Sequence, residues 1–74
     1  MGSHDLMRIP VESSLLSSLT YSEHRTLELY FRTGAVYRYY SVPREVLQAL
    51  LAAPSKGAYF NRHIRDRFHH QRIA

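Results

Sequence analysis

The sequence predicts an α+β domain in which a three-stranded antiparallel sheet is followed by two short helices that pack on one face. Two observations support this fold class. Between residues 15 and 42, runs of apolar and aromatic residues alternate with polar ones and are separated by turn signals, which is typical of half-buried strands. From Pro43 onward, apolar residues instead recur at spacings of three and four, which is typical of amphipathic helices. The predicted order is therefore β-β-β-α-α.

The first two strands are predicted over residues 15–22 and 26–32. The first, LLSSLTYS, is rich in apolar and small residues with partial alternation, and the polar run SEHR after it indicates a turn. The second, TLELYFR, alternates clearly and places Leu27, Leu29 and Phe31 on one face. We expect that face to meet the helices.

A hairpin is predicted to join the second strand to a third one, AVYRYYSV, through the loop RTG, in which Gly34 supplies the left-handed conformation of a bulged turn. This loop fixes a register in which apolar groups share one face and complementary pairs share the other. A shift by one residue would mix apolar and charged groups on both faces, so we reject it. The predicted partners are Leu29 with Tyr37 and Leu27 with Tyr39 on the apolar face, and Glu28 with Arg38 and Tyr30 with Val36 on the other.

Two helices are predicted in the C-terminal half. Pro43 suits a first helical position, and the segment REVLQALLAA after it carries one apolar stripe before a second proline ends it. Ser55 is a natural N-cap for the second helix, KGAYFNRHIRDRF, whose core stripe contains Phe60, Ile64 and Phe68. Together the two stripes would cover one face of the sheet.

At 74 residues the chain is expected to form one small domain, over residues 8–70. Residues 1–7 are expected to be disordered or a cloning remnant, and residues 71–74 to be a frayed tail. The chain contains no cysteine, which favours a reducing compartment, and it shows neither an apolar run of membrane-spanning length nor the apolar stretch of a signal peptide. We therefore expect a soluble cytoplasmic protein.

The net charge of +4 is unevenly placed along the chain. Residues 1–54 hold five basic and five acidic side chains, whereas residues 55–74 hold five basic side chains against Asp66 alone. Such a terminal positive field attracts polyanions. The alternative interpretation is a solvated basic helix followed by a frayed tail.

The start of the second helix is the first candidate contact for a polyanion. Free backbone N–H groups and the helix dipole near Ser55, Lys56 and Gly57 favour an anion, and Arg62 and Arg65 continue the positive charge along the helix. Structural interpretations stand beside this one. A serine cap needs no ligand, and a glycine early in a helix indicates either close backbone packing or a bound group.

The sheet face opposite the helices is the second candidate contact. Tyr30, Arg38 and Tyr40 share this face, and exposed aromatic rings beside basic groups suit unpaired RNA or DNA. The same residues also suit a half-covered sheet surface on which Glu28 neutralises Arg38.

Catalysis and metal binding are not expected. The histidines near the C-terminus, His63, His69 and His70, diverge or lie two helical turns apart, and no cysteine is available to complete a zinc site. His63 as the general base of a nuclease would need a second proton-transfer group and a pocket, for which two short helices on three strands leave little room. No phosphate-binding loop or nucleophile elbow occurs in the sequence, and we expect neither a cofactor nor a small-molecule substrate.

The succession LELYFRTGAVYRYYSVP, a short amphipathic helix and SKGAYFNRHI resembles the KTSC domain, named for the C-terminal region of some lysyl-tRNA synthetases and also found as small bacterial proteins. The likeness spans about residues 11–70, and one departure is Thr20, where the family pattern has glycine. The resemblance implies a domain of unknown function, with RNA binding suggested by the attachment to a synthetase and with no catalytic residues. The family marks fall on Tyr37, Tyr39, Val42 and Pro43, and on Ser55, Lys56, Gly57, Phe60, Asn61 and Ile64.

Taken together, these features predict a nucleic-acid-binding module, for RNA more than for DNA. The alternative is a protein-interaction or self-association module that uses the sheet face of Tyr30, Val36 and Tyr40 or an open strand edge. The candidate nucleic-acid contacts are Arg38, Tyr40, Ser55, Lys56, Gly57, Asn61, Arg62 and Arg65.

Overall fold

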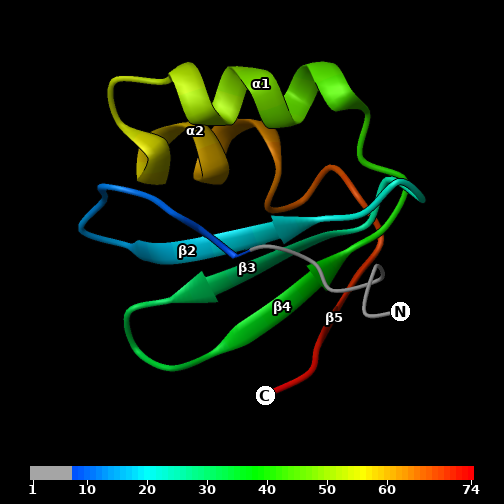
Figure 1. The fold of residues 1–74 in the computed structure, drawn as a ribbon, viewed down its shortest axis with the longest axis horizontal. Helices are drawn as coiled ribbons and strands as arrows, with labels where there is room; N and C mark the ends of the chain where they lie inside the picture. Colours follow the sequence, from blue (N-terminus) through cyan, green and yellow to red (C-terminus); the bar gives the residue numbers. More distant parts are fainter. Residues whose placement is uncertain (1–7) are drawn as a thin grey trace.

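Two helices cover one face of an antiparallel sheet (Figure 1). The structure, a computed structural model, describes residues 8–74, and the segment 1–7 that was expected to be disordered or a remnant lies outside the described residues. The two helices on one face of the antiparallel sheet (Figure 1) confirm the predicted α+β class and the predicted placement of the helices. The elements are β1 (Ile9–Pro10), β2 (Leu16–Tyr21), β3 (Leu27–Phe31), β4 (Val36–Tyr39), α1 (Arg44–Ala52), α2 (Lys56–His63) and β5 (His70–Arg72).

The sheet of the described residues has five strands in the order β1-β2-β3-β4-β5, so the prediction of three strands is corrected. The three predicted strands are β2, β3 and β4. At one edge the two-residue β1 pairs with β2, and its proline is tolerated because it lies on an edge strand. At the other edge β5 pairs with β4. Both additional strands are too short for an alternating pattern to reveal them.

The C-terminal segment 71–74 is not a frayed tail, as predicted, but part of the sheet. Beyond the β4–β5 ladder, the backbone N–H of Tyr40 donates to the carbonyl of His69 at 2.9 Å, and that of Ile73 donates to the carbonyl of Val36 at 2.8 Å. These bonds join main-chain groups, so they do not depend on an apolar side-chain pattern. The domain therefore extends beyond residue 70.

Helix α2 ends at His63, five residues before the predicted end at Phe68. The backbone N–H groups of Ile64 and Arg65 both bond to the carbonyl of Phe60, and the chain then turns toward β5. Pairing of the tail with β4 thus overrides the helical pattern of this segment. As a consequence, Arg65 does not continue a helical line from Arg62, as the sequence pattern predicted.

The hairpin between β3 and β4 has the predicted register in all four of its strand pairs. Gly34 lies in the turn with φ of +99°, a conformation that residues with a Cβ rarely adopt. The four pairs are Leu27 with Tyr39, Glu28 with Arg38, Leu29 with Tyr37, and Tyr30 with Val36.

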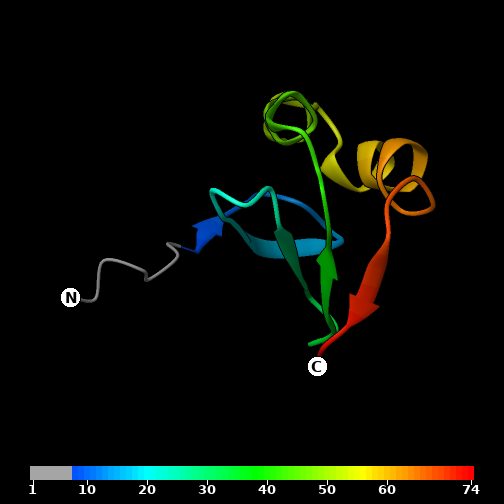
Figure 2. The ribbon, with the colours of Figure 1, turned by 90° about the vertical axis from the view of Figure 1, so that its right-hand side faces the viewer.

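The core lies between the helices and the inner face of the sheet, and Tyr39 belongs to it with only 2% of its surface exposed. Figure 2 shows both helices above the strands, with α2 on the same side of the molecule as β5. Phe60 and Ile64 are buried as the predicted stripe requires, whereas Phe68 is half-buried beyond the end of the helix. Tyr37 and Tyr39 therefore point toward the helices, as the register predicted.

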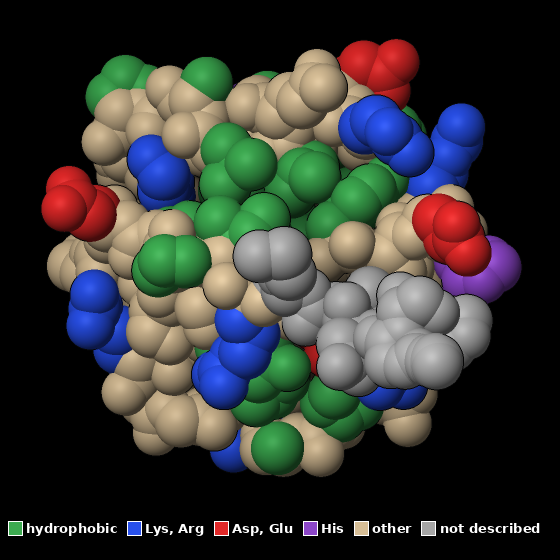
Figure 3. Space-filling view, in the orientation of Figure 1, with side chains coloured by type: hydrophobic (Ala, Val, Ile, Leu, Met, Phe, Trp, Pro, Cys, Tyr) green, Lys and Arg blue, Asp and Glu red, His purple; other side chains and the backbone are tan. Residues whose placement is uncertain are grey.

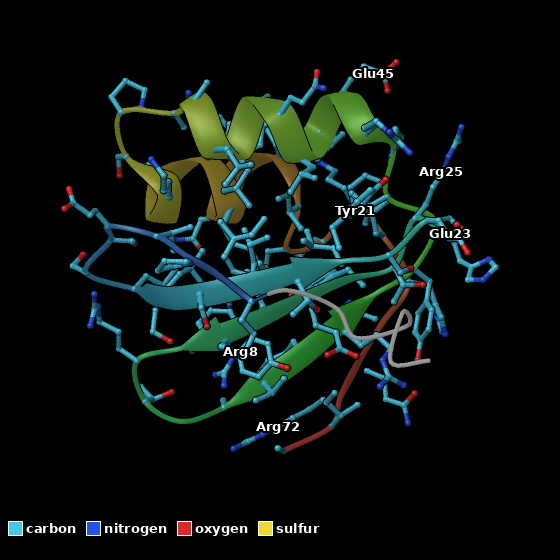
Figure 4. The ribbon with its side chains drawn as sticks, viewed as in Figure 1. Arg8, Tyr21, Glu23, Arg25, Glu45 and Arg72 are labelled. Carbon is cyan, nitrogen blue, oxygen red and sulfur yellow. The ribbon has the colours of Figure 1, made fainter. Side chains whose placement is uncertain are left out.

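The outer face of the sheet carries polar and charged side chains. Near β1, the guanidinium carbon of Arg8 lies 3.9 Å from the centre of the Tyr30 ring. Figure 4 labels Arg8 in front of the strands of the sheet. On the side of the molecule drawn in Figure 3, hydrophobic side chains gather between α1 and the sheet, while Lys and Arg side chains are dispersed around them. Among residues 8–74, neither helix has the length and apolar character needed to cross a membrane.

Candidate nucleic-acid interface

The start of α2 is tied to the protein's own groups. Ser55 caps the helix, because its Oγ accepts a hydrogen bond from a backbone N–H of the first turn at 3.2 Å. The ammonium of Lys56 donates to the carbonyl of Ala53 at 3.0 Å, at the end of α1. A Cβ added to Gly57 would lie 3.3 Å from the Cβ of Leu15, so close packing accounts for this glycine. The two structural interpretations that the sequence allowed, a serine that caps the helix and a glycine in close packing, are therefore both found in the structure.

Beyond the helix start, Arg62 and Arg65 present their charges to solvent. Arg62 lies in the last turn of α2 and Arg65 in the turn that follows it, and both side chains are exposed. In the part of the chain that the structure describes, the one ion pair joins Arg38 to Glu28, so neither Arg62 nor Arg65 is neutralised by a carboxylate. These two groups are the accessible positive charges predicted at this end of the domain.

The outer sheet face holds the remaining predicted contacts, Arg38 and Tyr40. The Nε of Arg38 donates to Glu28 at 2.8 Å, and this hydrogen bond is the main reason that the pKa of Arg38 is raised above its usual value. The hydroxyl of Tyr40 donates to the amide oxygen of Gln71 at 3.0 Å, and that of Tyr30 to Glu28 at 3.3 Å. These polar groups are satisfied by one another. Because this face lies opposite the helices, the predicted contacts do not form one continuous surface.

A pocket of about 460 Å³ lies between α2 and the inner face of β4 and β5. We call it the aromatic pocket. The expectation of little room for a pocket is wrong, because β5 and the turn before it supply an additional wall. The aromatic members of its lining are Phe31, Tyr37, Tyr39, Phe60 and His70, and the others are Leu15, Asn61, Arg65 and Asp66.

The rings of the aromatic pocket pack against one another in fixed orientations. The imidazole of His70 stacks on Tyr39 with ring centres 5.0 Å apart. Phe60 meets the rings of Phe31 and Tyr39 edge to face, at 5.4 and 5.8 Å, and Phe31 meets Tyr37 in the same way at 5.6 Å. Offset and edge-to-face geometries are the favourable ones for aromatic pairs. The pocket wall is therefore preformed by the fold.

Polar groups lie at the margin of this pocket. Burial of Tyr39 raises the pKa of its phenol from 10.0 to about 12, so its hydroxyl keeps its proton even at pH 10. Asn61, Arg65 and Asp66 contribute an amide and two opposite charges to the lining. Beside the pocket, the guanidinium carbon of Arg72 lies 6.0 Å from the centre of the Tyr37 ring. The interior thus suits a neutral planar group. A positive charge lies near each of the two tyrosines, Arg65 near Tyr39 and Arg72 near Tyr37.

Sequence reasoning placed Asn61 and Arg65 among the candidate contacts but missed the pocket that they line. The missed members include Tyr37 and Tyr39, which the strand register assigned only to the core. One signal was present in the sequence, because four of the residues that carry the family resemblance belong to this lining: Tyr37, Tyr39, Phe60 and Asn61. No group of three or more metal-ligating side chains occurs among residues 8–74.

The fold and the pocket define a small α+β domain with a ligand-sized aromatic pocket beneath its second helix. The sequence profile of the KTSC domain matches residues 12–68. The chain belongs to the KTSC domain family, as its motifs indicated. The crystal structure of a KTSC domain protein from Yersinia pestis superposes with a TM-score of 0.89 at 35% sequence identity, covering 95% of this chain and 100% of that one.

Similar sequences occur both as small proteins and within larger ones. An uncharacterized protein of Stutzerimonas stutzeri is 51% identical over 57 residues, which cover 76% of this chain and 80% of that protein. The lysine–tRNA ligase of Nostoc punctiforme is 34% identical over 74 residues, and that of Trichormus variabilis is 35% identical over the same length. These matches cover 95% of this chain but only 13% of each ligase.

Proposed function

We propose that the domain is a nucleic-acid-binding module, for RNA more than for DNA, that contacts phosphates through Lys56, Arg62 and Arg65. The observation that carries the proposal is the pair of exposed guanidinium groups at the end of α2. Arg62 and Arg65 belong to the segment that holds the chain's whole excess of positive charge, and neither forms an ion pair within residues 8–74. Lys56 has three N–H donors, so its bond to one carbonyl leaves two for a phosphate.

The relatives favour RNA as the nucleic acid. A segment similar to nearly all of this chain occurs in lysine–tRNA ligases, whose name says that they act on tRNA. A positive segment without base-reading motifs would add affinity for the RNA backbone without dictating its sequence. We therefore expect binding that depends on salt more than on nucleotide sequence.

The salt dependence of RNA affinity tests this function. Each phosphate contact on a single strand contributes a slope of about −0.7 to the logarithmic plot of affinity against salt, so three contacts predict a slope of about −2. A fourfold rise in salt then lowers the affinity about 20-fold. Fluorescence anisotropy with a labelled single-stranded RNA and a labelled RNA hairpin measures this slope.

The double variant Arg62→Gln, Arg65→Gln is expected to reduce the slope to about −0.7, the value for one remaining contact. Its matched control, Arg25→Gln with Arg44→Gln, removes the same charge from the β2–β3 turn and the start of α1. The salt slope of this control should stay closer to the value of about −2 expected for the unmodified chain. Undetectable binding of the unmodified chain at low salt, or equal slopes for the two variants, would end the proposal.

The second candidate function is self-association or partner binding through the open edge of β5. The strand is exposed throughout, and Ile73, one of the exposed large hydrophobic residues, follows it directly. An unpaired edge accepts a further strand through main-chain bonds. Sedimentation measurements that show a mass rising with concentration would favour this function. Tyr40→Glu should abolish the rise, because the hydroxyl of Tyr40 donates to the side chain of Gln71 in β5. A constant monomer mass would exclude self-association.

A further inference from the structure

We propose that the aromatic pocket holds one unpaired nucleobase of the bound nucleic acid. The inference rests on the proposed function and names the part of the RNA that the pocket recognises. It follows from the size of the pocket, the chemistry of its lining and the positions of the charges beside it.

The size and the lining suit a planar aromatic ligand. The volume of about 460 Å³ falls within the usual range for small-ligand pockets. Tyr37 is half-buried and lines the pocket, so its ring is both held in place and accessible. Proteins bind unpaired bases by stacking them on such rings, and the loss of one stacked base lowers affinity between about 5-fold and 150-fold.

The polar groups of the lining match the edge of a base. The amide of Asn61 contains both donors and an acceptor, as base edges do, and its side chain is exposed at the pocket. The hydroxyl of Tyr39 keeps its proton well above neutral pH and adds a potential donor. Asp66 supplies acceptor oxygens.

The charges also indicate which part of a nucleotide enters. Asp66 lines the pocket and repels a phosphate or a carboxylate inside it, whereas a neutral base meets no such penalty. Arg65 is the cation of the lining, and Arg72 lies beyond Tyr37 on β5, where Figure 4 labels it close to the C-terminus. A strand whose base occupies the pocket would leave on both sides toward a guanidinium group. The arrangement therefore favours a base inside and phosphates outside.

Amide chemical shifts of the whole chain test the occupant directly. Titration with adenosine monophosphate is expected to shift the signals of Tyr37, Asn61 and His70, and titration with ribose phosphate is expected to leave them unchanged. Equal shifts with the two compounds, or shifts confined to residues outside the pocket, would overturn the inference. So would an aromatic amide such as N-acetyltyrosinamide filling the pocket in place of the nucleotide, because the occupant would then be a protein side chain.

Variants distinguish a failure of this inference from a failure of the proposed function. Tyr37→Leu and Asn61→Ala are expected to lower the affinity for a single-stranded RNA of about 10 nucleotides, the former about 10-fold, while the salt slope stays the same. Tyr59→Leu, which removes a half-buried ring of α2 outside the pocket, is the control and should bind normally. Asn61 is exposed, so its variant folds even if Tyr37→Leu does not. Wild-type affinity in both pocket variants, with a steep salt slope, would refute the base site and leave the proposed function standing.

Discussion

Replacement of Thr20 by valine is expected to stabilise the domain. Thr20 lies near the end of β2 opposite Glu28, only 3% of its surface is exposed, and its Oγ1 has no hydrogen-bond partner among residues 8–74. A buried hydroxyl without a partner costs about 1 to 3 kcal/mol.

Valine keeps the shape of threonine and replaces this hydroxyl with a methyl group, so we expect the free energy of unfolding to rise by about 1 to 2 kcal/mol. For a domain of this size, such a gain raises the melting temperature by about 5 to 15 °C. Thermal and urea denaturation followed by circular dichroism measure both quantities.

Two further variants separate the hydroxyl from other effects of the substitution. Thr20→Ser keeps the hydroxyl and removes a buried methyl group, so it should destabilise the domain by about 1 kcal/mol. Thr33→Val makes the same chemical change in an exposed turn, where the hydroxyl accepts a bond from the backbone N–H of Ala35 at 3.4 Å, and it should bring no gain. A loss of stability in Thr20→Val would show that the hydroxyl is satisfied and would refute the reasoning.

Two other predictions concern the turn and the buried phenol. Gly34→Ala should lower the free energy of unfolding by about 1 to 2 kcal/mol, because φ is +99° and no atom lies within 4 Å of the added Cβ, so the cost comes from the backbone alone. Unchanged urea denaturation would contradict this. Burial raises the pKa of the Tyr39 phenol from 10.0 to about 12. The buried phenol therefore contributes its full share to the free energy of unfolding below pH 10, and this contribution is lost as the pH rises through 12. Denaturation midpoints measured over this pH range should fall more in the wild type than in Tyr39→Phe. Equal falls would refute the assignment of this pH dependence to the phenol of Tyr39.

The part of the fold that the sequence predicted well is the part governed by local chemistry. Gly34 fixes the turn, and the alternation of the flanking strands admits one register, which the pairing of Glu28 with Arg38 supports. Similarly, Ser55 caps α2 as its position before the helix indicated. In each case the decisive groups are neighbours in sequence or directly opposite in one hairpin.

The part that was missed depends on groups far apart in the chain. The strand β5 is exposed along its length, so its side chains show no alternation, and its backbone bonds to β4 carry no sequence signal. The same pairing ends α2 early and brings His70 against Tyr39. The pocket could not be predicted for this reason, although its motif tyrosines were oriented correctly.

The connection between β4 and β5 has a consequence for the dynamics of the domain. Residues 40–69, including both helices, separate the two strands, so closing this loop costs about 2 kcal/mol more entropy than closing a hairpin of three residues. We therefore expect β5 to dock late in folding and to detach early, with faster hydrogen exchange than the central strands. Detachment of β5 would carry His70 away from Tyr37 and Tyr39. A ligand that requires the complete wall of the aromatic pocket would therefore slow hydrogen exchange in β5.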